Sequence, residues 1–99
     1  MNPQPKTTRY ENKKYLAFIR KHPCCVFGCN GRDIEAHHVP LGQAGKGIKA
    51  PDTHAIPLCF SHHREHDGIG QKTFFDKHSL FPERIIIRLL TEYLEGLKK

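Results

Sequence analysis

The spacing of apolar side chains predicts a helix near each end of the chain. Over residues 11–22, apolar and aromatic side chains recur at the helical positions i, i+3, i+4 and i+7. Pro23 ends this segment, because the residue before a proline disfavours the α region. Over residues 82–97, Pro82 and Glu83 suit a first helical turn. The following apolar stripe predicts core packing. It consists of Ile86, Leu89, Leu90, Tyr93, Leu94 and Leu97.

Shorter patterns between these helices predict two strands and two further helices. Residues 33–39 and 53–58 are strand candidates, separated by a loop rich in glycine and lysine. Residues 59–67 and 71–78 then predict short helices. We therefore expect a small α+β fold in a single domain over residues 10–99. Residues 1–9 contain two prolines and no apolar anchor, so they predict a flexible basic tail.

The composition indicates that this domain needs help to fold. A chain of 99 residues with 37% hydrophobic residues and a mean hydropathy of −0.59 has little material for a core. Four cysteines and eight histidines are present, and ten of these twelve lie between Cys24 and His66. No apolar run approaches ~18 residues, which excludes a membrane span, and the first residues lack a signal peptide's apolar region. We expect a cytoplasmic protein whose reduced thiols bind metal.

The charge balance points to the class of partner. The formal net charge of +6, with an isoelectric point near 9.3, favours a polyanion such as nucleic acid over an acidic small molecule. The modest core leaves both a monomer and a homodimer open.

Two short ligand pairs predict a structural zinc site. Four residues separate Cys24 from Cys29, and two separate Cys59 from His62, so knuckles at 24–29 and 59–62 would form a tetrahedral Cys3His site. Cys25 competes with Cys24, which we favour because its longer spacer wraps more easily. Structural zinc would contribute directly to the folding free energy.

The first knuckle contains two glycines that the turn is expected to need. Gly28 and Gly31 flank Cys29, and we expect both to adopt positive φ.

The remaining histidines form a second candidate site. His37 and His38 are adjacent on a predicted strand, so their side chains point to opposite faces or splay at its end. One imidazole would then bind a metal ion while the other faces a substrate. His63 shares one helix face with Asp67 at i+4 and with His66 at i+3, and either pair could hold an ion.

These residues carry a resemblance to a known family. The strings EAHHV at 35–39 and DTHAIPLCFSHH at 52–63 resemble the HNH nucleases, most closely their small zinc-containing members from phages and prophages. The resemblance covers roughly residues 10–79. It implies a treble-clef-like ββα-metal core at about residues 33–68 and divalent-metal-dependent cleavage or nicking of DNA. The cofactors it implies are a structural Zn²⁺ and a catalytic Mg²⁺, Mn²⁺, Ni²⁺ or Zn²⁺, in an intracellular bacterial or phage-encoded protein.

The resemblance also implies residue roles. His38 matches the general base, and His37 matches the metal ligand that precedes it. His54 occupies the middle position of the motif, where the family often has asparagine that helps to hold the base. His63 matches the second metal ligand.

The third metal ligand and the DNA contacts are less closely defined. Where relatives place another histidine four residues after the second ligand, this chain has Asp67, with His66 one residue earlier. We favour Asp67 and keep His66 as the alternative. Arg64 is a candidate phosphate clamp, and Lys46 and Lys49 in the glycine-rich loop are candidate DNA contacts.

Two functions from different classes follow. The first is a DNA endonuclease, and the second is a zinc-ribbon module that binds nucleic acid without cutting it. Both would use the Cys3His site and the positive charge. Only the nuclease needs the surplus histidines at positions 37, 38 and 63.

Overall fold

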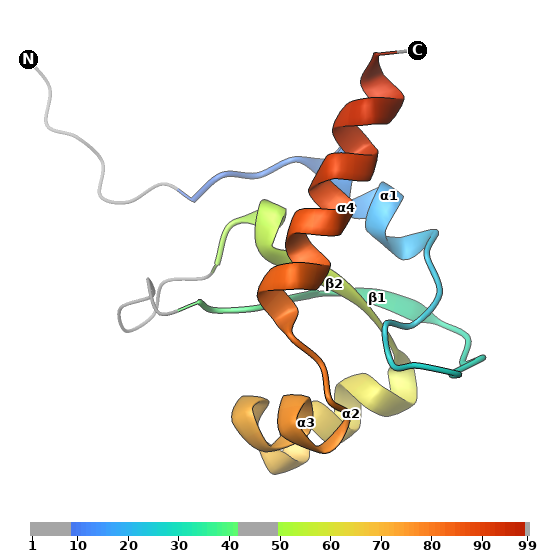
Figure 1. The fold of residues 1–99 in the computed structure, drawn as a ribbon, viewed down its shortest axis with the longest axis vertical. Coiled ribbons are helices and arrows are strands. Elements are labelled where there is room, and N and C mark those ends of the chain that lie inside the picture. The colour runs from blue at the N-terminus through green and yellow to red at the C-terminus, as the bar shows by residue number, and fades with distance from the viewer. Residues whose placement is uncertain (1–8, 42–49, 99) are drawn as a thin grey trace, which may run out of the picture.

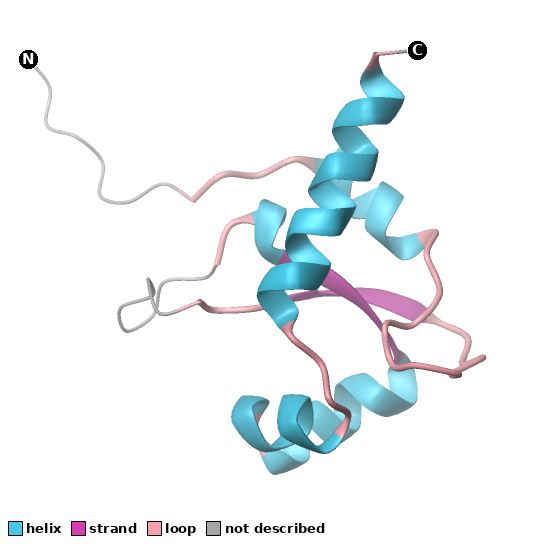
Figure 2. Cartoon of the chain, viewed as in Figure 1, coloured by secondary structure: helices cyan, strands magenta, loops and turns pink. Residues whose placement is uncertain are grey.

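The computed structural model describes residues 9–41 and 50–98, which form a small α+β domain around a two-stranded antiparallel sheet (Figures 1 and 2). The strands are β1 (Ile34–His38) and β2 (Ala55–Cys59), paired with Ile34 opposite Cys59 and His38 opposite Ala55. The helices are α1 (Lys13–Arg20), a one-turn 3₁₀ helix η1 (Asp52–His54), α2 (Phe60–Ile69), α3 (Gln71–Lys77) and α4 (Pro82–Leu97). The predicted fold class of small α+β is confirmed.

Helices cover both faces of the sheet. In Figure 1, α1 and α4 lie on one side of the strands, and α2 and α3 lie on the other. Each side has its own apolar cluster. The buried residues of the first are Tyr15, Ile19, Ala55 and Leu89. The buried residues of the second are Cys24, Val39, Ile56, Leu58, Cys59, Phe74, Phe75 and Ile86.

The strand register decides which way each histidine faces. Successive side chains of a strand point to opposite faces, and Ala55 and Ile56 accordingly belong to different clusters. His38 pairs with Ala55 and His37 pairs with Ile56. His37 therefore faces α2, where it contacts His63, while His38 faces the other way and contacts Asp52. The predicted divergence of these two side chains is confirmed.

The second strand begins later than its sequence pattern predicts. The pattern indicated strand from residue 53, whereas Asp52–His54 form η1 and β2 starts at Ala55. The main-chain N–H of His54 donates to the carbonyl of Pro51, which turns the chain just before the strand. This turn buries the side chain of Asp52 at the end of the sheet.

The apolar stripe of α4 is buried over only part of its length. Ile86 and Leu89 are buried, but Leu94 and Leu97 are 58% and 65% exposed, so core packing is wrong for these two leucines. At 1.5 Å per residue, α4 is about 24 Å long and α1 about 12 Å. The C-terminal end of α4 consequently extends past the body of the domain (Figure 1).

Within residues 9–41 and 50–98, no helix has the length and apolar character needed to cross a membrane.

Candidate functional site

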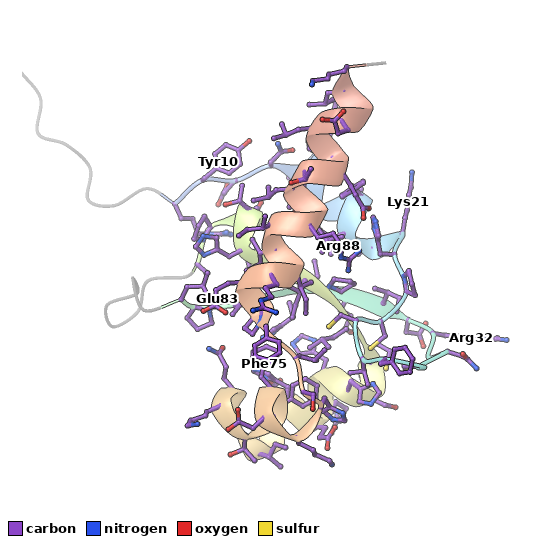
Figure 3. The ribbon with its side chains drawn as sticks, in the orientation of Figure 1. Tyr10, Lys21, Arg32, Phe75, Glu83 and Arg88 are labelled. Carbon is purple, nitrogen blue, oxygen red and sulfur yellow. The ribbon has the colours of Figure 1, made fainter. Side chains whose placement is uncertain are left out.

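Three cysteines and one histidine converge where the loop after α1 meets the end of β2 and the start of α2. Sulfur atoms, drawn yellow in Figure 3, lie between this loop and the end of β2. The donor atoms, all within 4.8 Å of one another, are the Sγ atoms of Cys24, Cys29 and Cys59 and Nδ1 of His62. The sulfur-to-nitrogen distances are 3.4, 3.5 and 3.3 Å, and the Sγ atoms of Cys29 and Cys59 lie 3.9 Å apart. Tetrahedral Zn²⁺ would require about 3.6 and 3.8 Å. The donor set is therefore compatible with a structural zinc ion.

Cys25 lies outside this group. Its thiol pKa is raised to about 12, first by burial and then by the neighbouring Cys24. Its main-chain N–H donates to the carbonyl of Pro57 at 2.9 Å, which ties the knuckle to β2 while its thiol stays out of the donor set. Of the two alternatives, the structure brings Cys24 to the candidate zinc site.

The two knuckle glycines have different roles. Gly28 has φ +78°, as predicted, but positive φ at Gly31 is wrong. Gly31 is needed for close packing, because a Cβ there would lie 2.7 Å from both Cβ and Sγ of Cys59. The Gly31 N–H also donates to Cys29 Sγ at 3.2 Å, which stabilises negative charge on that sulfur.

One thiol of the cluster, Cys24, is neutral until a cation binds. Burial raises the pKa of Cys24 to about 11, so this thiol is protonated near neutral pH until a metal ion displaces the proton.

A second set of donors shares His62 with this cluster. His62, Glu65 and His78 also bring ligand atoms within 4.8 Å of one another. Glu65 already accepts a hydrogen bond at 2.9 Å from Nε2 of His78 and contacts Lys77. The carboxylate is thus largely satisfied by the protein, and we assign His62 to the cysteine cluster.

The other candidate site begins with two imidazoles from β1 and α2. Nδ1 of His37 and Nε2 of His63 lie 3.1 Å apart. On the far side of the second ring, Nδ1 of His63 is 2.5 Å from Oε1 of Glu35. A carboxylate only accepts, so the His63 proton sits on Nδ1 and the Nε2 lone pair points toward His37. This carboxylate–histidine arrangement is the usual support of a metal-bound imidazole.

The environment of His37 suits a metal ligand. Burial, followed by neighbouring His66 and His63, lowers its pKa to about 3, so the ring is neutral near pH 7. Its Nε2 is buried without a hydrogen-bond partner in the described chain. Two nitrogens bound to one ion at about 2.1 Å would lie about 3.0–3.4 Å apart, which matches the observed separation. The residues present therefore fit a divalent cation held by His37 and His63.

The choice between Asp67 and His66 as third ligand stays open. His66 is buried, contacts the His37 ring edge to face with ring centroids 4.2 Å apart, and has no partner for Nε2 in the described chain. Asp67 is exposed, and its pKa is lowered chiefly by a hydrogen bond from His66. Within residues 9–41 and 50–98, neither completes a three-ligand group with His37 and His63.

On the opposite face of β1, His38 meets an acid that the sequence analysis did not single out. Nε2 of His38 lies 2.7 Å from Oδ1 of Asp52, whose side chain is 3% exposed. Arg9 Nη1 donates to the same oxygen at 2.8 Å, and the Asn12 N–H donates to Oδ2 at 2.7 Å. Arg9 was expected in a flexible tail, and that expectation is wrong for this residue. Residues 1–8 lie outside the described residues.

His54 does not reach His38. Its Nδ1 is buried and has no hydrogen-bond partner among residues 9–41 and 50–98, while its main-chain carbonyl accepts from the Val39 N–H at 3.0 Å. The backbone of His54 thus supports the end of β1, and the carboxylate of Asp52 occupies the place beside the His38 ring.

The predicted DNA contacts are only partly described. The guanidinium of Arg64 lies over the Phe60 ring at 5.3 Å, and with Asp67 and Gly68 it lines an open hollow of about 370 Å³. The predicted contacts Lys46 and Lys49 lie outside the described residues.

The two acidic residues that contact the candidate site histidines, Glu35 and Asp52, differ in how far the sequence alone could have predicted them. Glu35 stands two positions before His37, so strand alternation places both on one face. Asp52 is 14 residues from His38 and carries no local signal.

Comparisons with known proteins identify relatives but no activity. The chain is similar to the uncharacterized protein YdfU of Escherichia coli (strain K12), with 39% identity over 61 residues. That segment is 62% of this chain and 17% of the relative. No solved structure gives a significant match. The DUF968 family, described as proteins of unknown function, matches residues 2–90. Since this match covers most of the 99 residues of the chain, the chain belongs to the DUF968 family.

Proposed function

We propose that this protein is a divalent-metal-dependent DNA endonuclease of the HNH type. The observation that carries the proposal is the pair of facing nitrogens on His37 and His63, which lie 3.1 Å apart. Of these two residues, His37 directly precedes His38 in the sequence. His38 donates through Nε2 to Asp52 and has no partner for Nδ1 in the described chain. One imidazole is thus available as a base; it directly follows His37 in the sequence and lies on the opposite face of β1 from the two imidazoles arranged as ligands.

The chain's residues have defined roles in this reaction. His38 takes a proton from water through Nδ1 while the water oxygen bonds to phosphorus, and the bond from phosphorus to the 3′ oxygen breaks. His37 and His63 would hold the cation, with Glu35 fixing the orientation of His63. When bound, the cation supplies Lewis-acid stabilisation of the phosphate and of the leaving oxygen.

Charge and the zinc cluster support the same proposal. The net charge of +6 favours a polyanionic substrate. Arg64 follows His63 directly on α2, where a guanidinium suits a phosphate oxygen pair. A structural zinc ion bound through His62 would hold the first turn of α2 against β2, and so would position His63 one residue later.

The proposal is tested by relaxation of supercoiled plasmid. The purified full chain is assayed after brief chelation and removal of the chelator, with zinc content confirmed, and then with added Mg²⁺, Mn²⁺, Ni²⁺ or Zn²⁺. We expect cleavage that requires a metal and falls about 10²- to 10⁴-fold in His38→Ala, the usual contribution of a general base. His37→Ala should also lose activity, and excess metal should partly restore it.

A histidine outside the site provides the matched control. His22 lies two residues after the end of α1, with its ring nitrogens contacting the Phe18 carbonyl and Glu92. His22→Gln should cleave like the wild type. If the wild type and His38→Ala are equally inert with every metal but both bind DNA, the non-catalytic zinc-ribbon module is the better account and the nuclease proposal fails.

A further inference from the structure

We propose that Asp52 is the positioning residue of His38, holding its ring with the proton on Nε2 and the Nδ1 lone pair presented outward. The catalytic role of this positioning rests on the proposed function. The contact between Asp52 and His38 is observed independently of that function. Nε2 of His38 and Oδ1 of Asp52 are 2.7 Å apart, and the carboxylate is buried. An ionised carboxylate only accepts, so Nε2 must be the donor.

Other contacts keep Asp52 ionised and in place. Arg9 and the Asn12 N–H donate to its two oxygens, so the carboxylate accepts bonds from three groups, including His38. Its main-chain N–H donates to the carbonyl of Tyr10 at 3.0 Å. Residues 9–12 therefore hold both the backbone and the side chain of Asp52, and the carboxylate has little freedom to turn away.

The orientation matters because the two ring nitrogens have different surroundings. With Nε2 committed to Asp52, only Nδ1 is available to accept a proton from water. The negative charge of Asp52 would then stabilise the imidazolium that forms, as the buried acid of a hydrolase triad does. Asp52 itself touches neither DNA nor cation in this account, so its role is to position and support His38.

The test reads the tautomer of His38 directly. Long-range ¹H–¹⁵N correlation spectra of the ¹⁵N-labelled full chain, at a pH where imidazole is neutral, distinguish a proton on Nε2 from one on Nδ1. We expect Nε2–H in the wild type. Asp52→Asn is made in an Arg9→Ala background, because Arg9 donates to the same oxygen as His38 and would hold the amide oxygen there. Without Arg9, the amide oxygen would accept from the Asn12 N–H, and the amide nitrogen would face His38. The His38 proton should then move to Nδ1, and plasmid cleavage should fall about 10²- to 10⁴-fold.

Asp76→Asn is the matched control, because this carboxylate is exposed on α3 and, within the described part of the chain, pairs only with Lys72. It should leave the tautomer and the cleavage rate unchanged. Zinc content and circular dichroism report whether Asp52→Asn folds. If the variant does not fold, the position of the His38 proton in the wild-type spectrum decides the inference.

Two results would overturn the inference: wild-type His38 protonated on Nδ1, or a tautomer unchanged in a folded Asp52→Asn variant. A tautomer that shifts in a protein inert on DNA would support the positioning by Asp52 and refute the nuclease proposal separately.

Discussion

Cys24 and Cys25 are sequence neighbours with different surroundings. Of the two thiols, only that of Cys24 joins the donor atoms of the first knuckle. Cys24 points to His62 with its sulfur 3.4 Å from Nδ1. Cys25 uses its main-chain N–H to join β2, and burial keeps its thiol protonated. At the scale of single residues, the order of the two thiols along the chain decides which one reaches the cluster.

We predict opposite effects of serine at these two positions. Cys24→Ser should lose most of its zinc, about one ion per chain in the wild type, because a tetrahedral site needs all four donors. Cys25→Ser should retain it. Zinc per chain is measured by mass spectrometry after extensive dialysis, with circular dichroism as the folding control. Zinc retained in Cys24→Ser and lost in Cys25→Ser would reverse the assignment.

At the scale of elements, α4 is a helix with two environments. Its first half packs Ile86 and Leu89 against both apolar clusters. Its second half carries Leu94 and Leu97 with more than half of each side chain exposed. The stripe has one helical period throughout, so the difference comes from the length of the helix relative to what it covers.

We predict that one substitution has unequal costs along this stripe. Leu89→Ala should lower the free energy of unfolding by about 2–5 kcal/mol, because Leu89 is fully buried. Leu97→Ala should change it by less than about 0.5 kcal/mol. Urea unfolding of the zinc-loaded proteins measures both. Equal, large losses would mean that the end of α4 is covered in solution.

At the scale of the whole molecule, two small apolar clusters sit on opposite faces of a sheet with only two strands. Neither cluster is large, as the low hydrophobic fraction implies. The cysteine cluster joins the knuckle after α1 to the end of β2 and the start of α2. A bound ion would thus connect three segments of the chain through four side chains.

We predict that metal removal destabilises the entire domain. Chelation at neutral pH should lower the midpoint of thermal unfolding by more than ~20 °C. A structural zinc ion contributes several kcal/mol to the free energy of unfolding, and each kcal/mol lost lowers the midpoint by about 4–8 °C in a domain of this size. Far-ultraviolet circular dichroism during heating measures the midpoint. The control is the same chelator saturated with zinc. An unchanged midpoint after verified zinc loss would show that the apolar clusters suffice.

Local signals in the sequence determined the elements and the donor types. Apolar periodicity located α1 and α4, and histidines at helical spacing located α2, because such spacings along a helix do not depend on distant contacts. The short spacings within each knuckle identified the cysteine and histidine donors, since ligands so close in sequence need only a turn to converge. Strand alternation separated His37 from His38 for the same local reason.

The tertiary structure alone decided contacts between distant residues. Asp52 meets His38 across 14 residues and Arg9 across 43, and no periodicity relates such positions. Gly31 is required by the sulfur of Cys59 against it, and Leu97 is exposed because nothing in the described chain covers the end of α4. A local pattern predicts the face of an element, but the packing of other elements decides what that face meets.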